Sequence, residues 1–338
     1  MRIHRLRLPV VCAVLLLALL APALPWLARA QQPATGSAAS QEKPQETIRV
    51  GVNLVNLYAT VRDKDKRILP DLTKADFRIY EDGQEQTIDS FAREVNLPLT
   101  FGMLIDTSGS QRHVLPIEQD AADRFLGRVL RKGDLAFVTS FDADVNLLSD
   151  FTGERRELIR AIERARINAP GNPLQAGPFP LPPRGTLFYD AIYATCREKL
   201  AGEAGRKALI ILTDAMDQGS RMSLEEALET AQRTDTVIHV IGVADYAFYG
   251  GRGYGGYSGE GYARKLAEQT GGRSIFVNNE KNLEKAFEQI SEELRTQYVL
   301  GYYPTNRAKD GKFRKIEIKM AKSDAKVLAR RGYYAPAR

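Results

Sequence analysis

The chain has 338 residues, of which 43% are hydrophobic and 27% charged, and this composition excludes a largely disordered protein. Its formal charge of +6 is concentrated at the start, because residues 1–30 hold four arginines and no acidic residue, and the remainder carries 44 basic against 42 acidic side chains. This near balance leaves no electrostatic case for nucleic-acid binding, so we expect no nucleic-acid partner.

Residues 1–30 have the three parts of a secretory signal peptide. A basic start is followed by an apolar segment at residues 8–20 and by Ala28-Arg29-Ala30, which fits an A-x-A cleavage site. An uncleaved membrane anchor is the alternative, but prolines interrupt the segment, which is short for a membrane span. We predict cleavage after Ala30 and a secreted or periplasmic protein that meets the membrane only through this leader.

Residues 31–46 are mostly small and polar, which predicts a flexible linker. Residues 47–96 then show the alternating apolar pattern of β-strands, with Asp82-Gly83 as a hairpin turn between residues 77–80 and 86–88. About 50 residues of sheet are too few to close a hydrophobic core alone. We therefore expect this segment to be one part of a β-domain.

Residues 97–295 alternate between strand and helix patterns. The strands are expected at residues 99–105, 135–141, 145–148, 206–213, 236–243 and 274–277. The helices are expected at residues 112–131, 154–166, 223–233, 262–269 and 283–294, with another beginning at Thr186. This order predicts an α/β fold with a doubly wound, mostly parallel, Rossmann-like sheet.

The β pattern returns in residues 296–338, with strands expected at residues 298–303, 313–320 and 327–334. Lysines alternate with Ile316 and Ile318, and we interpret them as a solvated sheet face in preference to a basic binding stripe. Two incomplete β segments flank one α/β unit. We expect them to pack together as an all-β, sandwich-like domain into which the α/β domain is inserted.

Few residues of this chain suit a disulfide or a zinc site. Cys196 is the only cysteine after residue 30, so no internal disulfide can form, and we expect a buried apolar residue. Two scattered histidines, His113 and His239, cannot build a structural zinc site with one cysteine.

Oxygen-bearing side chains occur in three of the loops between the expected elements. Asp106, Ser108 and Ser110 come directly after the apolar run at residues 99–105, and Asp214 follows the run at residues 206–213. Thr186 opens a later helix. Asp and Ser are also common at helix N-termini, so the first turn alone is a weak signal. Parallel strands end at the same edge of a sheet, however, so we expect all five side chains to meet there.

Five oxygen donors at one point predict a site for Mg²⁺ or Mn²⁺. Two carboxylates and three neutral hydroxyls leave the ion incompletely satisfied, so an Asp or Glu carboxylate of a partner protein could complete it. We therefore predict a protein-binding or adhesion module that is not an enzyme and has no catalytic residue.

Two other functions fit parts of the same pattern. A divalent-metal-dependent hydrolase of the phosphoesterase type could use the same edge, where Asp142, Asp144 and Asp217 are also expected. No second cluster of His, Cys or paired carboxylates supplies a base or nucleophile, and no G-x-S-x-G or P-loop motif is present. A third possibility is anion binding by backbone N–H groups of the helix that follows Ser110.

The motif resembles the metal-ion-dependent adhesion site (MIDAS) of the von Willebrand factor A (VWA) domain. In that family a D-x-S-x-S turn, a Thr in a second loop and an Asp in a third loop hold the cation. The resemblance implies that the serines and Thr186 are ligands and that Asp106 and Asp214 bind directly or through water. One departure is that the common D-G-x-D loop has Ala215 at its second position.

The resemblance covers roughly residues 98–294, and the flanks extend it. The sequences LPDLTKADFRIYEDGQEQTIDSF before this segment and YVLGYYPTN and ARRGYYAP after it resemble those of secreted bacterial VWFA-related proteins. The resemblance implies a fold and a metal site, and it names no ligand.

Two long loops are expected beside the predicted metal site. Residues 168–185 are rich in proline, and residues 246–261 carry tyrosines among glycines. Aromatic side chains on a glycine-rich backbone suit adaptable contacts, so Tyr249, Tyr254 and Tyr257 are our candidates for partner binding. A disordered insertion without contacts is the equal alternative.

Overall fold

The computed structural model describes residues 54–94, 97–168, 185–243, 259–321 and 325–337. The chain divides into two units, residues 1–50 and residues 51–338, and all the described residues belong to the second. The expected signal peptide and linker lie outside the described residues and remain predictions. Among the described helices, none has the length and apolar character needed to cross a membrane.

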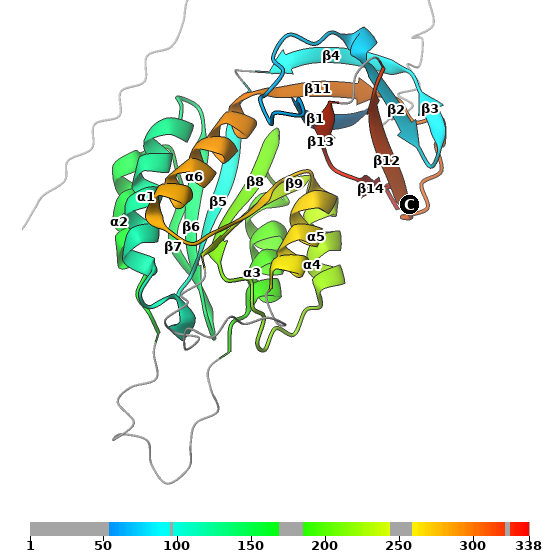
Figure 1. Ribbon diagram of the computed structural model, residues 1–338. Helices are drawn as coiled ribbons and strands as arrows, with labels where there is room; N and C mark the ends of the chain where they lie inside the picture. Colours follow the sequence, from blue (N-terminus) through cyan, green and yellow to red (C-terminus); the bar gives the residue numbers. More distant parts are fainter. Residues whose placement is uncertain (1–53, 95–96, 169–184, 244–258, 322–324, 338) are drawn as a thin grey trace, which may run out of the picture. The chain divides into compact units, whose positions relative to one another are not determined.

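A six-stranded, mostly parallel sheet forms the centre of the α/β part (Figure 1). Its strands, in spatial order, are β10 (Ser274–Val277), β9 (Thr236–Val243), β8 (Arg206–Thr213), β5 (Leu99–Asp106), β6 (Leu135–Phe141) and β7 (Val145–Thr152). All neighbours pair in parallel except β6 and β7, which are antiparallel. The predicted fold class is confirmed for this part of the chain.

Helices cover both faces of this sheet (Figure 1). One face packs against α1 (Leu115–Val129), α2 (Arg155–Arg164) and α6 (Glu280–Arg295). The other packs against α3 (Phe188–Ala194), which continues as the π-helical turn Thr195–Leu200, and against α4 (Leu224–Arg233) and α5 (Glu260–Thr270). Successive residues of β5 serve the two faces in turn, since Met103 and Ile105 pack on the first and Leu104 on the second.

The two ends of the described chain supply two further four-stranded sheets. The first has β13 (Lys326–Leu328), β1 (Val55–Arg62), β11 (Gln297–Tyr302) and β4 (Ile88–Glu94), and the second has β14 (Gly332–Tyr334), β12 (Phe313–Met320), β2 (Phe77–Glu81) and β3 (Gln84–Gln86). Every pairing within them is antiparallel, and both sheets mix strands from before and after the α/β part. They share one apolar core, which confirms the predicted sandwich-like arrangement.

The exposed face of β12 also agrees with its sequence pattern. Lys315, Glu317 and Lys319 are exposed, whereas Ile316 is buried. The alternating lysines therefore belong to a solvated sheet face.

Cys196 is fully buried, as expected, and burial raises the pKa of its thiol to about 12.

Several boundaries differ from the predictions for local reasons. The helix expected from residue 112 begins at Leu115, because a 3₁₀ turn, Gly109–Gln111, and further turn residues come first. The helix expected from Thr186 begins at Phe188, whose N–H donates to the Asp217 carboxylate. The strand expected at residues 327–334 is two strands, β13 and β14, because the chain changes sheets between them.

Candidate metal centre

Asp106 lies at the carboxyl end of β5 and is fully buried. Its Oδ1 accepts a hydrogen bond from the Ser108 N–H at 2.9 Å, and its Oδ2 accepts one from Thr213 Oγ1 at 2.6 Å. Thr213 is the last residue of β8, the neighbouring strand, and directly precedes Asp214. The carboxylate of Asp106 is therefore fixed in orientation and tied to the end of the next strand.

Ser108 and Ser110 lie in the turn that follows. The Gln111 N–H donates to the Ser108 carbonyl at 3.0 Å and closes the 3₁₀ turn. This turn brings the Ser108 and Ser110 Oγ atoms to 3.0 Å from one another. Two neutral hydroxyls are thus adjacent just beyond the Asp106 strand end.

Thr186 belongs to a segment that bridges the two neighbours of β5. The Leu187 N–H donates to the Asp142 carbonyl, after β6, at 2.8 Å, and the Gln218 N–H, after β8, donates to the Thr186 carbonyl at 2.9 Å. Since β5 lies between β6 and β8, these bonds hold Thr186 across the end of β5. Gly185 makes this approach possible, because a Cβ there would lie 1.5 Å from the Gln218 carbonyl oxygen.

Asp214 is 6% exposed, and its Oδ1 accepts a hydrogen bond from the Met216 N–H at 3.0 Å. Ala215 occupies the position at which the resemblance led us to expect glycine. It adopts the left-handed conformation, with φ of 60°, and its N–H donates to Thr213 Oγ1 at 2.9 Å. The alanine therefore keeps the backbone shape that a glycine would adopt more easily.

The acidic groups of this edge influence one another strongly. Burial and the neighbouring Asp214 carboxylate raise the pKa of Asp106 to about 7. Burial, followed by the charges of Asp106 and Asp214, raises the pKa of Glu118 on α1 well above its ordinary value. Neither Asp106 nor Glu118 forms an ion pair with a basic side chain within the described ranges.

Unpartnered acceptor atoms lie beside these acids. Both carboxyl oxygens of Glu118 and the Oε1 of Gln111 are buried and have no hydrogen-bond partner in the described part of the chain. Buried acceptors that have no partner among the described residues and lie near buried acids are groups that a hard cation can satisfy. The residues present therefore fit a divalent ion in the chemistry of their donor atoms.

The donor set differs from that of an all-carboxylate or histidine site. No group of three or more His, Cys, Asp or Glu side chains that could hold a metal ion occurs among the described residues. The set predicted from the sequence does not need one, because it combines two carboxylates with three hydroxyls. Ions of the Mg²⁺ and Mn²⁺ class accept oxygen donors of both kinds and retain water ligands.

Three side chains near this edge were not anticipated as parts of the site. Glu118 stands on the apolar face of α1 between Leu115 and Ala122, and an acid within an apolar helical stripe was the available signal. Gln111 and Thr213 gave no signal of their own, because their positions depend on the packing of neighbouring elements.

Two of the three further acids predicted at this edge, Asp142 and Asp217, form hydrogen bonds with the loops around it. Asp142 accepts hydrogen bonds from Thr107 Oγ1 at 2.7 Å and Asn168 Nδ2 at 2.9 Å. Asp217 accepts one from the Phe188 N–H at 3.0 Å and so caps α3. These carboxylates position the loops that carry the predicted ligands.

The residues predicted to contact a partner are not placed. Tyr249, Tyr254 and Tyr257 lie outside the described residues, so their role stays a prediction. The described ends of the two long loops do adjoin the site. The Asn168 N–H donates to the Thr107 carbonyl, and a Cβ on Gly259 would lie 1.9 Å from the Ala215 carbonyl oxygen.

No protein-family profile and no curated protein matches the chain. Among solved structures, BatB from Bacteroides thetaiotaomicron is 18% identical with a TM-score of 0.44, over 59% of this chain and 100% of BatB. The vWF domain of the pilus tip protein Mfa5 from Porphyromonas gingivalis is 14% identical with a TM-score of 0.43, over 59% of this chain and 95% of that domain. A von Willebrand factor type A structure from Catenulispora acidiphila is 11% identical with a TM-score of 0.46, over 78% of this chain and 74% of that structure. VWA domains are thus among the solved structures that this chain resembles.

Proposed function

We propose that this chain is an exported binding module that uses a divalent cation, Mg²⁺ or Mn²⁺, to bind an Asp or Glu carboxylate of a partner protein. Asp106, Ser108, Ser110, Thr186 and Asp214 would hold the ion. The observation that carries the proposal is the buried Asp106 carboxylate. It accepts hydrogen bonds from the Ser108 N–H and from Thr213 Oγ1 at the end of β8, and the charges of Asp214 and of the buried Glu118 lie close to it. Asp106 and Glu118 form no ion pair with a basic side chain among the described residues.

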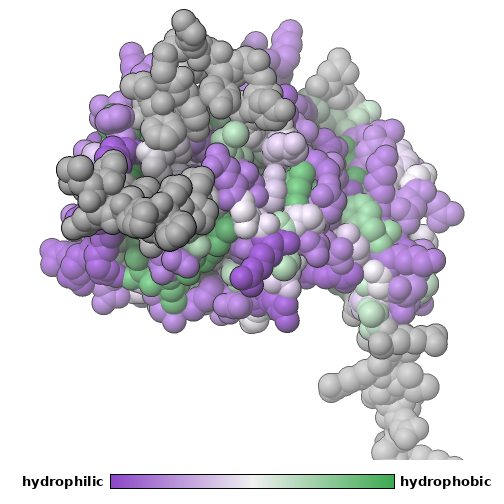
Figure 2. Space-filling model, turned by 90° about the horizontal axis from the view of Figure 1, so that it is seen from below, coloured by the Kyte–Doolittle hydropathy of each residue, from purple (hydrophilic) through white to green (hydrophobic). Residues whose placement is uncertain are grey.

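The character of the surface supports a partner held by charge and hydrogen bonds. Figure 2 shows the face that is turned downward in Figure 1, and most of its coloured surface is hydrophilic. Hydrophobic surface occurs there in separate areas. On a hydrophilic face, a bound cation would give a partner's carboxylate a directional contact, whereas burial of apolar surface is not directional.

The contacts of nearby acids favour binding over hydrolysis. A hydrolase at this edge would need a carboxylate free to act as a base. Asp142 and Asp217, two of the three acids that could assist, already accept hydrogen bonds that hold Asn168 and the start of α3. Their roles are explained by the support they give to the loops.

The test is a thermal melt of the mature protein in chelator and in excess Mg²⁺ or Mn²⁺. At a metal concentration about 100 times the dissociation constant, the ion should stabilise the wild type by about 2.7 kcal/mol. Each kcal/mol raises the Tm by about 2–4 °C for a domain of this size. Asp106→Ala should abolish the increase and still fold, because it removes a buried acid that lies close to another.

Asp120→Ala is the matched control, since Asp120 is an exposed carboxylate on α1. It should keep the metal-dependent increase. Equal increases in wild type and Asp106→Ala would refute the metal site.

The partner is tested separately, by a pull-down from the envelope fraction of the source. The chain should recover a protein in Mg²⁺ and lose it in chelator. Equal recovery in Mg²⁺ and in chelator would refute binding of a carboxylate through the ion.

A further inference from the structure

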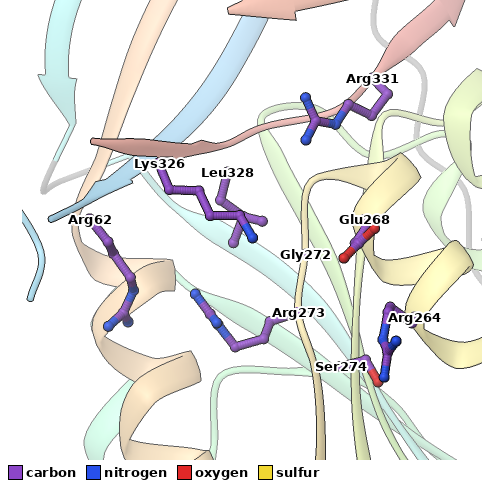
Figure 3. Close-up of a pocket in the computed structure, with 9 residues that line it drawn as sticks. All are labelled: Arg62, Arg264, Glu268, Gly272, Arg273, Ser274, Lys326, Leu328 and Arg331. Carbon is purple, nitrogen blue, oxygen red and sulfur yellow. The ribbon is translucent and has the colours of Figure 1, made fainter. Parts of the chain in front are cut away.

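A second polar site lies away from the predicted metal centre. It is a cavity of about 240 Å³ between the β-sandwich strands and the start of β10. Its lining residues are Arg62, Arg264, Glu268, Gly272, Arg273, Ser274, Lys326, Leu328 and Arg331 (Figure 3). β10 begins at Ser274, whereas the predicted metal ligands follow the carboxyl ends of β5 and β8. Because these strands are parallel, the two sites lie at opposite ends of the sheet.

The walls of this cavity are held together by direct contacts. Glu293 of α6, whose side chain is 1% exposed, pairs with Arg62 at 3.0 Å and with Arg273 at 2.6 Å. The Arg331 N–H donates to the Gln269 carbonyl at 3.0 Å. Gly271 allows the close approach, since a Cβ there would lie 2.5 Å from the Arg330 backbone nitrogen. The cavity is therefore preformed by packing, which lowers the cost of binding a ligand.

Positive charge exceeds negative charge around this cavity. Five of its lining side chains are cationic and one, Glu268, is acidic. Glu293 neutralises part of the charge of Arg62 and Arg273, and Glu260 pairs with Arg264. Lys326 and Arg331 have no recorded ion pair in the described part of the chain. Two cationic side chains are thus left in excess.

The lining side chains of the cavity also include a neutral hydrogen-bond donor, the Ser274 hydroxyl. Ser274 Oγ is buried and has no hydrogen-bond partner within the described ranges. Figure 3 shows Lys326 and Arg331 extending from one wall and Arg273, Arg264 and Ser274 from the other. Guanidinium and ammonium groups with a hydroxyl suit the oxygens of a phosphate. Drug-sized ligands occupy pockets of about 300–1,000 Å³, so this smaller space fits a small anion.

We propose that this cavity binds a small dianion that carries a phosphate group. Lys326 and Arg331 provide the two charges that offset those of the ligand, and Ser274 Oγ donates a hydrogen bond to it. Inorganic phosphate and the phosphate monoester of a small molecule share this chemistry. The inference is independent of the proposed metal-dependent function.

The test is a calorimetric titration of the mature protein with inorganic phosphate and with phenyl phosphate, in chelator and at constant ionic strength. The wild type should bind at least one of them, and binding of the ester alone would identify a monoester site. The double variant Lys326→Gln/Arg331→Gln should bind at least tenfold more weakly. Ser274→Ala, which changes no charge, should weaken binding by a smaller factor.

The matched control is Lys312→Gln/Lys315→Gln, which removes two exposed lysines near and on β12. This control should bind phosphate with the affinity of the wild type. Asp106→Ala should do the same, because the predicted metal centre lies at the other end of the sheet. The absence of binding of both ligands to the wild type would overturn the proposal. So would equal affinities of the two double variants, because non-specific attraction would then explain the binding.

Discussion

At the scale of single residues, the predicted metal centre contains two buried acids, Asp106 and Glu118, that have no basic partner in the described part of the chain. Asp106 and Glu118 are fully buried, and the charge of Asp214 acts on both. Burial of acids without a basic partner costs stability, so it needs a compensating gain. A divalent ion would provide that gain. We therefore expect the ionised acids to lower the free energy of unfolding of the metal-free protein.

Glu118→Gln tests this cost directly. The pKa of Glu118 is raised in the folded chain above its ordinary value of 4.5. The unfolded chain therefore loses its proton first, and the folded state loses stability as pH rises above about 4.5. In chelator, the variant should melt at a higher temperature than wild type at pH 7.5 and at nearly the same temperature at pH 4.5.

The control for this comparison is Glu198→Gln, at an exposed glutamate, which should leave the melting temperature nearly unchanged at both values of pH. If Glu118→Gln changed the melting temperature equally at pH 4.5 and 7.5, ionisation of the Glu118 carboxyl would not be what destabilises the fold. The measurement is a thermal melt followed by circular dichroism.

From the sequence, the predicted ligands could be assigned to one edge of the sheet, whereas Thr213, which holds Asp106, could not be foreseen. Asp106, Ser108 and Ser110 follow a buried strand directly, so their common edge could be inferred from the parallel order of strands. Thr213 is a strand residue like its neighbours, and its bond to Asp106 depends on the register of β8 against β5. That register arises from tertiary packing and leaves no local pattern.

At the scale of elements, the loop that carries Thr186 packs closely against the loop that follows β8. Gly185 packs against the Gln218 carbonyl, and Asp217 of the same neighbouring loop caps α3. The strands β5, β6, β8 and β9 were predicted closely because they are buried apolar runs, whereas the partly exposed β7 extends to Thr152, beyond the predicted end at residue 148. The starts of α1 and α3 were not predicted closely, because the 3₁₀ turn at Gly109–Gln111 and the Asp217 cap depend on contacts outside each helix. The start of α4 was, because Ser223 and Glu226 form the predicted capping box.

Gly185→Ala should displace Thr186 and weaken metal binding. An added Cβ would collide with backbone at 1.5 Å, so the loop must shift. Losing one hydroxyl ligand from an oxygen site should lower the affinity for Mg²⁺ by about tenfold or more, which corresponds to about 1.4 kcal/mol. The measurement is a calorimetric titration with Mg²⁺, which gives the dissociation constant of the ion and needs no partner protein.

Gly109→Ala is the control within the D-x-S-x-S turn. A Cβ at Gly109 would meet no atom within 4 Å, so the titration should resemble that of the wild type. Wild-type affinity in Gly185→Ala would mean that the Thr186 segment is not required for the ion. A loss in both variants alike would point to general damage of the edge.

At the scale of the whole described unit, the chain's two flanks and its α/β part are connected where they meet. Arg206 at the start of β8 is buried and donates to the carbonyls of Leu97 and Leu294, close to the points where the chain enters and leaves the α/β part. Glu293 links Arg62 of β1 with Arg273. The inserted order could be predicted from the two β segments, but these polar connections could not, because each joins residues far apart in sequence.

Glu293→Gln should therefore destabilise the α/β part and the β-sandwich together. The substitution removes the counter-charge of two guanidinium groups that are 11% and 29% exposed. Breaking a buried ion pair costs about 3–5 kcal/mol, and the partial exposure of Arg273 places the expected loss near the lower value. In urea, unfolding should remain a single transition with a lower midpoint, while Glu292→Gln, at the exposed neighbouring position, should keep the wild-type midpoint. An unchanged midpoint in Glu293→Gln would contradict the stabilising role of this ion-pair cluster, and two separate transitions would contradict the expectation that the two parts still unfold as one unit.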